Sequence, residues 1–175
     1  MSTRTKGGPL VSHTDQVLSR AVTFQFALDP TEDQRSLFAK CAGARRFAFN
    51  HHLARVKENL DQRAAEKDLP VGPRLPGISW SWVSFVNEMN AWKNGQLDSS
   101  PVNDDGTRGL AWRHEVPGDV FECASVDVAR ALKNWSDSKR GARKGASVGF
   151  PRFAAKGRTT PSFRLRNKAV VSQTK

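Results

Sequence analysis

Apolar and polar residues alternate along residues 21–28, and this is the clearest strand pattern in the chain. One face carries Val22, Phe24, Phe26 and Leu28, and the residues between them are small or polar. An alternation with a period of two is typical of a strand with one buried face. We therefore predict a strand that ends at Leu28.

The residues that follow predict a helix. Thr31, with Gln34 three positions later, has the spacing of a helix capping box. Glu32 and Asp33 place negative charge in the first turn, where the helix dipole favours it. The apolar side of this helix is expected to consist of Leu37, Phe38 and Cys41.

Gly43 predicts a break or bend, after which a second helix begins. Its apolar stripe has spacings of four, three and four, and consists of Phe49, Leu53, Val56 and Leu60. A helix, a glycine turn and a helix are typical of a helix-turn-helix domain whose second helix reads the major groove of DNA. Such helix pairs are also common in proteins that bind no DNA, so a purely structural pair is the alternative.

Two further helices are predicted in the central region. A connection rich in Pro and Gly covers 68–79, and Ser79 can cap a third helix that runs to Trp92. A polar loop over 94–109 separates it from a last helix that begins at 118–119. The expected buried positions are Trp82, Phe85 or Val86, Met89, Trp92, Phe121, Ala124, Val128, Ala131, Leu132 and Trp135.

Strand patterns return near the C-terminus. Phe163 and Leu165 alternate with Arg164 and Arg166, which predicts a strand with an apolar inner face and a cationic outer face. Residues 169–171 can begin another strand. Strands at both ends with helices between them predict an α+β fold, although so few strands make an incomplete sheet.

The net positive charge of the chain comes entirely from the C-terminal tail. Residues 1–138 hold 17 basic and 17 acidic residues, whereas residues 139–175 hold 11 basic residues and no acid, which accounts for the net charge of +11. Such a segment attracts polyanions, because each cation that reaches a phosphate releases condensed counterions.

The tail contains the sequence Gly-Phe-Pro-Arg-Phe at 149–153. Pro151 restricts the residue before it, and two rings flank a guanidinium group, a combination that favours contact with nucleic acid. The alternative is that both Phe side chains anchor a small core while the cations are only solvated.

Length and composition bound the remaining possibilities. A chain of 175 residues can form one domain or two small lobes. No apolar run is long enough to span a bilayer and no apolar signal core is present, so we expect a cytoplasmic protein without membrane contact. Cys41 and Cys123 lie far apart and give neither a disulfide framework nor paired zinc ligands. Residues 1–19 lack periodicity and predict a disordered leader.

Four short motifs resemble those of one family. They are RFAFNHHL at 46–53, VP at 116–117, RALKNW at 130–135 and VGFPRF at 148–153, after a strand that leads into DPTEDQ at 29–34. In this order they resemble the N-terminal half of TnpB, the transposon-encoded RNA-guided endonuclease long described as the OrfB insertion-sequence transposase. The resemblance covers about residues 20–168.

The resemblance implies a fold and a set of partners. Residues 20–29 would supply the first strand of a small oligonucleotide-binding β-barrel, the wedge, and residues 139–175 a basic linker and further strands. Residues 30–138 would be a helical recognition lobe inserted into that incomplete barrel. The implied partners are a guide RNA and a DNA target, with a separately encoded nuclease half as a further possibility, and no small-molecule substrate.

The cutting half of the family has no counterpart in this sequence. Its separated carboxylates and Cys-pair zinc ribbon are absent, so we expect a binding protein without catalytic residues, metal or cofactor. An acid and a thiol, Glu122 and Cys123, stand where the family often has an amide pair, which argues against reading of a target motif by that helix. His51 and His52 are expected to pack or to contact phosphate, because adjacent helix positions point apart.

Charge and position select the candidate contact residues. They are Arg45, Arg46, Arg55, Lys133, Lys139, Arg140, Arg143, Lys144, Arg152, Arg164 and Arg166 for phosphates, and Trp80 for stacking on a base. Three alternatives to guide binding stay open: a helix-turn-helix transcriptional regulator, an inactive transposon remnant, and a structural module whose basic tail only confers solubility.

Overall fold

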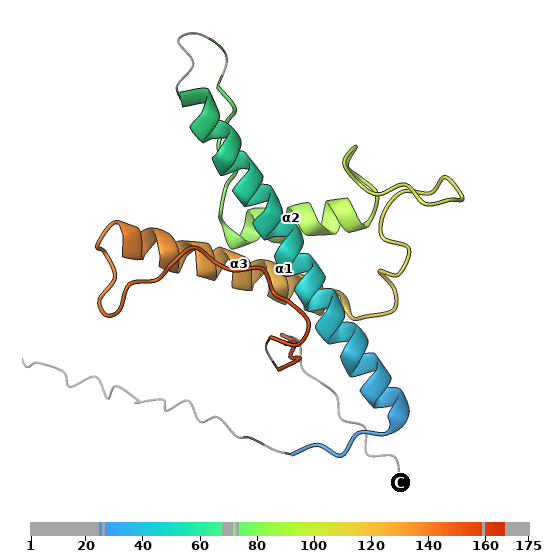
Figure 1. Cartoon of the computed structure of the whole chain (residues 1–175). Coiled ribbons are helices and arrows are strands. Elements are labelled where there is room, and N and C mark those ends of the chain that lie inside the picture. Colours follow the sequence, from blue (N-terminus) through green and yellow to red (C-terminus); the bar gives the residue numbers. More distant parts are fainter. Residues whose placement is uncertain (1–24, 26, 68–71, 73, 159, 167–175) are drawn as a thin grey trace, which may run out of the picture.

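The computed structural model describes residues 25, 27–67, 72, 74–158 and 160–166. In this part of the chain it contains three helices, α1 (Glu32–Lys67), α2 (Trp82–Lys93) and α3 (Gly118–Lys139). The third helix packs against both of the others. Figure 1 shows the long α1 crossing the two shorter helices. None of these described helices is both long enough and apolar enough to cross a membrane.

The first helix begins at the predicted capping box. The Thr31 N–H group donates to Gln34 Oε1 at 3.0 Å, and the Gln34 N–H group donates to Thr31 Oγ1 at 3.4 Å. This reciprocal pair satisfies two backbone donors at the helix start. The capping box is therefore confirmed.

The predicted break at Gly43 is wrong. α1 is 36 residues long and passes through this glycine without interruption, so the two predicted helices are one. A single glycine costs about 1 kcal/mol relative to alanine inside a helix. Burial of its small neighbours Cys41, Ala42 and Ala44 against the rest of the core offsets that cost.

The second helix starts at a different serine from the one predicted. Ser81, and not Ser79, is the N-cap, and its Oγ accepts a hydrogen bond from the Ser84 N–H group at 3.0 Å. Ser79 supports this cap, because its Oγ accepts from the Ser81 N–H group at 3.3 Å. The third helix begins at Gly118, as predicted.

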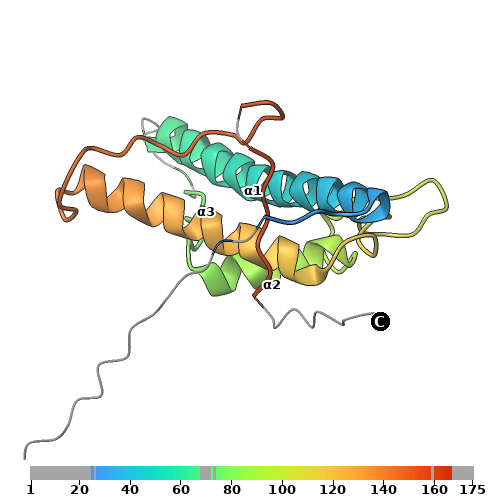
Figure 2. The ribbon, with the colours of Figure 1, turned by 90° about the horizontal axis from the view of Figure 1, so that it is seen from below.

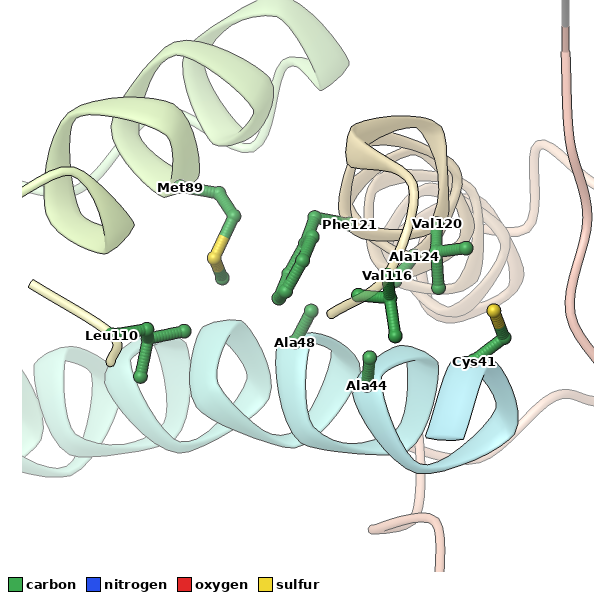
Figure 3. Packing of buried hydrophobic residues seen from close by; sticks show 9 residues of the cluster. All are labelled: Cys41, Ala44, Ala48, Met89, Leu110, Val116, Val120, Phe121 and Ala124. Atoms are coloured by element: carbon green, nitrogen blue, oxygen red, sulfur yellow. The ribbon is translucent and has the colours of Figure 1, made fainter. Parts of the chain in front are cut away.

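Buried apolar side chains form two clusters where the helices meet. The first cluster consists of Cys41, Ala44, Ala48, Met89, Leu110, Val116, Val120, Phe121 and Ala124. Figure 3 shows Phe121 of α3 pointing toward Ala48 of α1, beside Met89 of α2. The second cluster consists of Leu53, Val56, Phe85, Val128, Ala129 and Leu132. Most of the predicted helix stripes are thereby confirmed, but Leu37 and Trp82 were predicted wrongly, because they are 41% and 51% exposed.

The predicted α+β fold, with a helical lobe inserted into an incomplete β-barrel, is wrong for the described residues. They are helical, without a sheet, and their one isolated β-bridge joins Val102 to Arg108 in the loop between α2 and α3. Residues 162–166 have no strand partner there, and the side chains of Phe163, Arg164 and Arg166 contact the helices instead. A single extended segment cannot form a ladder by itself, and side-chain contacts attach this one to the helices.

Several predictions concern residues outside the described part of the chain. These are the leader at 1–19, most of the strand at 21–28 and the strand at 169–171. The structure therefore describes no strand of the predicted barrel, either before α1 or after α3.

The tail after α3 folds back over the helices. The Val148 N–H group donates to Ser138 Oγ at 2.9 Å. Asn50 of α1 exchanges two hydrogen bonds with the backbone of Ala154, at 2.9 and 2.7 Å. Figure 2 shows the tail, in red, crossing α1 and then passing over the other helices. The tail backbone is thus fastened to the helical core at these two places.

Candidate nucleic-acid interface

Cations gather around one acid at the end of α3, next to residues 139–145, which we call the basic turn. Lys133 and Arg140 both donate to the carboxylate of Asp137, and these hydrogen bonds lower the pKa of that group. Cations also suit this place because a helix C-terminus carries partial negative charge. Both residues therefore already have an acidic partner within the protein.

Three cations of the basic turn have no acidic partner among the described residues. Lys139 Nζ lies 5.6 Å from the centroid of the Trp135 ring, a cation–π contact. Arg143 donates to the backbone oxygen of Ala146 at 3.3 Å, and Lys144 is exposed. Each of the three can reach a phosphate without breaking an ion pair.

Trp80 packs against Trp135, the ring that Lys139 lies over. Its ring centroid lies 5.9 Å from that of Trp135, which in turn meets Phe150 edge to face at 5.0 Å. Both Trp80 and Phe150 are partly buried against the second core cluster. Stacking of a base on Trp80 stays a prediction, and only the exposed part of its ring could take part.

The segment 149–153 divides its two rings between the core and the surface. Phe150 packs inward, whereas Phe153 is 46% exposed beside α1. Arg152 between them is exposed and has no acidic partner in the described part of the chain. One ring therefore anchors the segment while the guanidinium and the second ring stay accessible.

Two candidate arginines meet at one acid of α3. Arg45 Nη2 of α1 lies 3.5 Å from Asp127 Oδ2, and Arg164 of the tail forms an ion pair with the other oxygen of that carboxylate. The side chains of Arg45 and Asp127 are only 25% and 21% exposed. A phosphate would have to compete with Asp127 for either arginine.

The remaining candidates differ in their surroundings. Arg55 forms an ion pair with Glu88 of α2, and burial lowers its pKa. Arg46 is half-buried and has no acidic partner among the described residues. The Arg166 guanidinium lies 5.7 Å from the centroid of the Trp82 ring. The predicted second surface on α1 is thus engaged mainly in helix packing.

Six accessible cations without an acidic partner share one stretch of chain, whereas others, such as Arg63 of α1 and Arg130 of α3, lie elsewhere on the described surface. This stretch begins at the last residue of α3, and the six cations are Lys139, Arg143, Lys144, Arg152, Lys156 and Arg158. Sequence reasoning did not select Lys156 and Arg158, although both lie in the same acid-free tail and have no acidic residue near them in sequence. We call these six residues the open cations.

The adjacent histidines pack in the core. The His52 side chain is fully buried, and its Nε2 lies 2.9 Å from Ser125 Oγ of α3. The His51 ring centroid lies 4.1 Å from that of Trp92. Burial lowers the pKa of His52 to about 3 and that of His51 to about 4. The described residues contain no group of three or more His, Cys, Asp or Glu side chains that could hold a metal ion.

Comparisons with known proteins agree with the sequence motifs. Residues 21–64 match the family HTH_OrfB_IS605, described as a helix-turn-helix domain. Two proteins of Mycobacterium tuberculosis, each named "Putative RNA-guided DNA endonuclease", are 30% identical over 135 residues, which is 77% of this chain and 26% of theirs. "Putative RNA-guided DNA endonuclease InsQ" of Escherichia coli is 30% identical over 140 residues, 80% of this chain and 27% of that protein.

The chain spans about a quarter of the length of the curated relatives it matches. The matched part is their N-terminal quarter, and their catalytic portion is not covered. The chain thus matches the HTH_OrfB_IS605 family over residues 21–64 and is similar, over most of its length, to the N-terminal quarter of TnpB-like RNA-guided DNA endonucleases.

Proposed function

We propose that this chain binds the phosphate backbone of nucleic acid as the N-terminal part of a TnpB-like RNA-guided system. The observation that carries this proposal is the set of open cations, which lie in an acid-free tail fastened to a helical core. Its ligand would be a guide RNA, a guide–target heteroduplex or the DNA target. In such a system base pairing reads the sequence, and the protein contributes cations and shape.

The fastening of the tail supports binding rather than mere solvation. Asn50 and Ser138 hold the tail at two places, and the ring of Phe150 packs against the core between them. Cations near such anchors lose less conformational freedom when they meet a phosphate than cations on a free chain. The tail is therefore better suited to a defined contact than to solubility alone.

Binding without cleavage is the role we propose for this chain. The described acids are engaged with cations or scattered over the surface, and the proposal requires no catalytic group. Cleavage, if the system retains it, would come from a nuclease half that joins this part.

A sequence-specific regulator is the second candidate, because the matched family is described as a helix-turn-helix domain. Against it stands the continuity of α1 over Glu32–Lys67, which leaves no turn between two helices in that range. A recognition helix would then have to be one end of α1. Phosphate contact by the open cations needs no such rearrangement.

The experiment that tests the proposal measures the affinity of the chain for three labelled ligands over a salt series. The ligands are structured RNA transcribed beside its own gene, duplex DNA, and an RNA–DNA heteroduplex. We expect the RNA or the heteroduplex to bind most tightly. Equal and weak binding that vanishes at physiological salt would indicate an inactive remnant, and strong preference for one duplex sequence would favour the regulator.

A further inference from the structure

Residues 162–166, which we call the strap, cross the helices without a strand partner among the described residues. The Phe163 ring lies 5.7 Å from that of Phe38 on α1. Arg164 forms the ion pair with Asp127 on α3, and Arg166 lies over the Trp82 ring of α2. Side-chain contacts to three different helices therefore hold the strap.

The strap covers one face of α3. Asp119, Cys123 and Asp127 are four residues apart, so they lie on the same side of the helix. Asp119 Oδ2 accepts the Arg166 N–H group at 3.3 Å, and Asp127 binds Arg164. The strap is thus attached on both sides of Cys123, whose exposed fraction is 1%.

The electrostatics of Cys123 agree with this position. Burial raises the pKa of its thiol, while the nearby positive charges of Arg164 and Arg166 act in the opposite direction. Two residues of the strap therefore lie close enough to affect the thiol directly. The strap therefore lies over the helix face that carries this thiol.

The contacts of the strap are of a kind that a polyanion can replace. The Arg164 side chain is 49% exposed and Leu165 is 44% exposed, so a single ring, Phe163, supplies the buried apolar contact. Partly exposed ion pairs contribute little free energy and weaken with salt. Asp127 would still have Arg45 as a partner after Arg164 left it. The exchange would therefore leave the Asp127 carboxylate with a cation.

We propose that the strap is an exchangeable cover, which lifts from α3 when nucleic-acid phosphates take Arg164 and Arg166 from Asp127 and Trp82. Asp127 is then an internal competitor that lowers the affinity of the chain for nucleic acid. This inference rests on the proposed function, because phosphates are what displace the strap. It adds a conformational change that binding by the open cations alone does not require.

The rate at which Cys123 reacts with a neutral maleimide reports whether the strap is lifted. The full chain is labelled with and without the RNA–DNA heteroduplex, and peptide mass spectrometry separates Cys123 from Cys41. We expect the heteroduplex to accelerate labelling of Cys123 several-fold. Global unfolding cannot explain an acceleration, because a ligand that binds the folded protein suppresses unfolding.

Arg164→Gln tests whether the ion pair with Asp127 holds the strap over Cys123. Loss of this cation by itself raises the thiol pKa and slows labelling, whereas loss of the strap contact speeds it. We expect several-fold faster labelling of Cys123 without nucleic acid, and little further acceleration by the heteroduplex. Slower labelling in this variant would mean that Arg164 does not hold the cover.

Asp127→Asn tests the internal competitor. We expect this variant to bind the heteroduplex several-fold more tightly than the original chain. Its matched control is Asp61→Asn, which adds the same charge and releases Lys57 at the far end of α1. If both variants bind the heteroduplex more tightly by the same factor, the effect comes from net charge alone. That result would overturn the role of Asp127 as a competitor.

The outcomes distinguish the cover from the proposed function. Heteroduplex binding with unchanged or slower labelling of Cys123 overturns the cover and leaves the proposed function intact. Failure of the original chain to bind any of the three nucleic acids overturns both.

Discussion

The Nε2 atom of His52 on α1 lies 2.9 Å from the Oγ atom of Ser125 on α3, and both side chains are completely buried. Ser125 Oγ also donates to the Phe121 carbonyl oxygen at 3.0 Å. The hydroxyl oxygen can then accept a hydrogen bond from His52, which fits a neutral imidazole protonated at Nε2. This pair joins the two longest helices inside the core.

Replacing Ser125 by alanine should destabilise the fold. The His52 Nε2–H group would be left buried without an acceptor, and such a group costs about 1–3 kcal/mol. We expect a decrease of this size in the free energy of unfolding, measured by urea denaturation. Asn134→Ala, at an exposed position of the same helix, is the control and should change stability by less than about 0.5 kcal/mol.

The two core histidines predict loss of stability in mild acid. In the folded protein their pKa values are lowered, chiefly by burial, to about 4 for His51 and about 3 for His52. In the unfolded chain they titrate near their ordinary value of about 6.5. Between these values the unfolded state binds more protons, so the free energy of unfolding decreases as pH falls from about 6.5 toward 4.

Urea denaturation at several pH values between 7 and 4.5 measures this dependence. Each histidine contributes at most about 1.4 kcal/mol per pH unit. His51→Asn should remove part of the slope, whereas His114→Gln, at an exposed position, should leave it unchanged. A slope that survives replacement of His51 and His52 together would contradict this origin.

Gly43→Ala should stabilise the protein by about 0.5–1 kcal/mol, because glycine is less favourable than alanine inside a helix. An added Cβ would meet only the end of the Arg46 side chain, at 3.9 Å. The thermal midpoint should therefore rise. A loss of stability would indicate that the chain turns at Gly43, as a helix-turn-helix requires.

Gly109→Ala should have the opposite effect and is the contrast to Gly43→Ala. Gly109 has a φ of +105°, and an added Cβ would lie 2.6 Å from the Lys93 carbonyl oxygen. Neither the backbone angle nor the contact tolerates a side chain without movement. We expect a decrease of more than about 1 kcal/mol in the free energy of unfolding.

Replacing the open cations Arg143, Lys144 and Arg152 together by glutamine should weaken binding to all nucleic acids. Each lost phosphate contact reduces the slope of log affinity against log salt by about 0.7–0.9, so the slope should fall by about 2–3. Lys40→Gln, whose cation is paired with Glu115, is the control. An unchanged slope in the triple variant would show that these three residues do not contact phosphates and that the contact surface lies elsewhere.

The local features of the fold could be predicted from sequence. The capping box of Thr31 and Gln34, the start of α3 and the buried stripes all depend on residues within one or two helical turns. The family resemblance rested on short motifs in order. The predicted strand at 162–166 failed because alternation shows which side chains share a face, but not whether that face meets a sheet or a helix.

By itself the sequence determined the helical faces, the acid-free tail and the similarity to TnpB-like proteins, because these depend on residue order and composition alone. Tertiary structure decided that α1 continues through Gly43, since burial against α3 outweighs a weak helix former. It also decided which cations are open. Arg45 and Arg164 lie far apart in sequence, and only folding brings both to Asp127 and leaves Lys144 or Arg152 without an acidic partner.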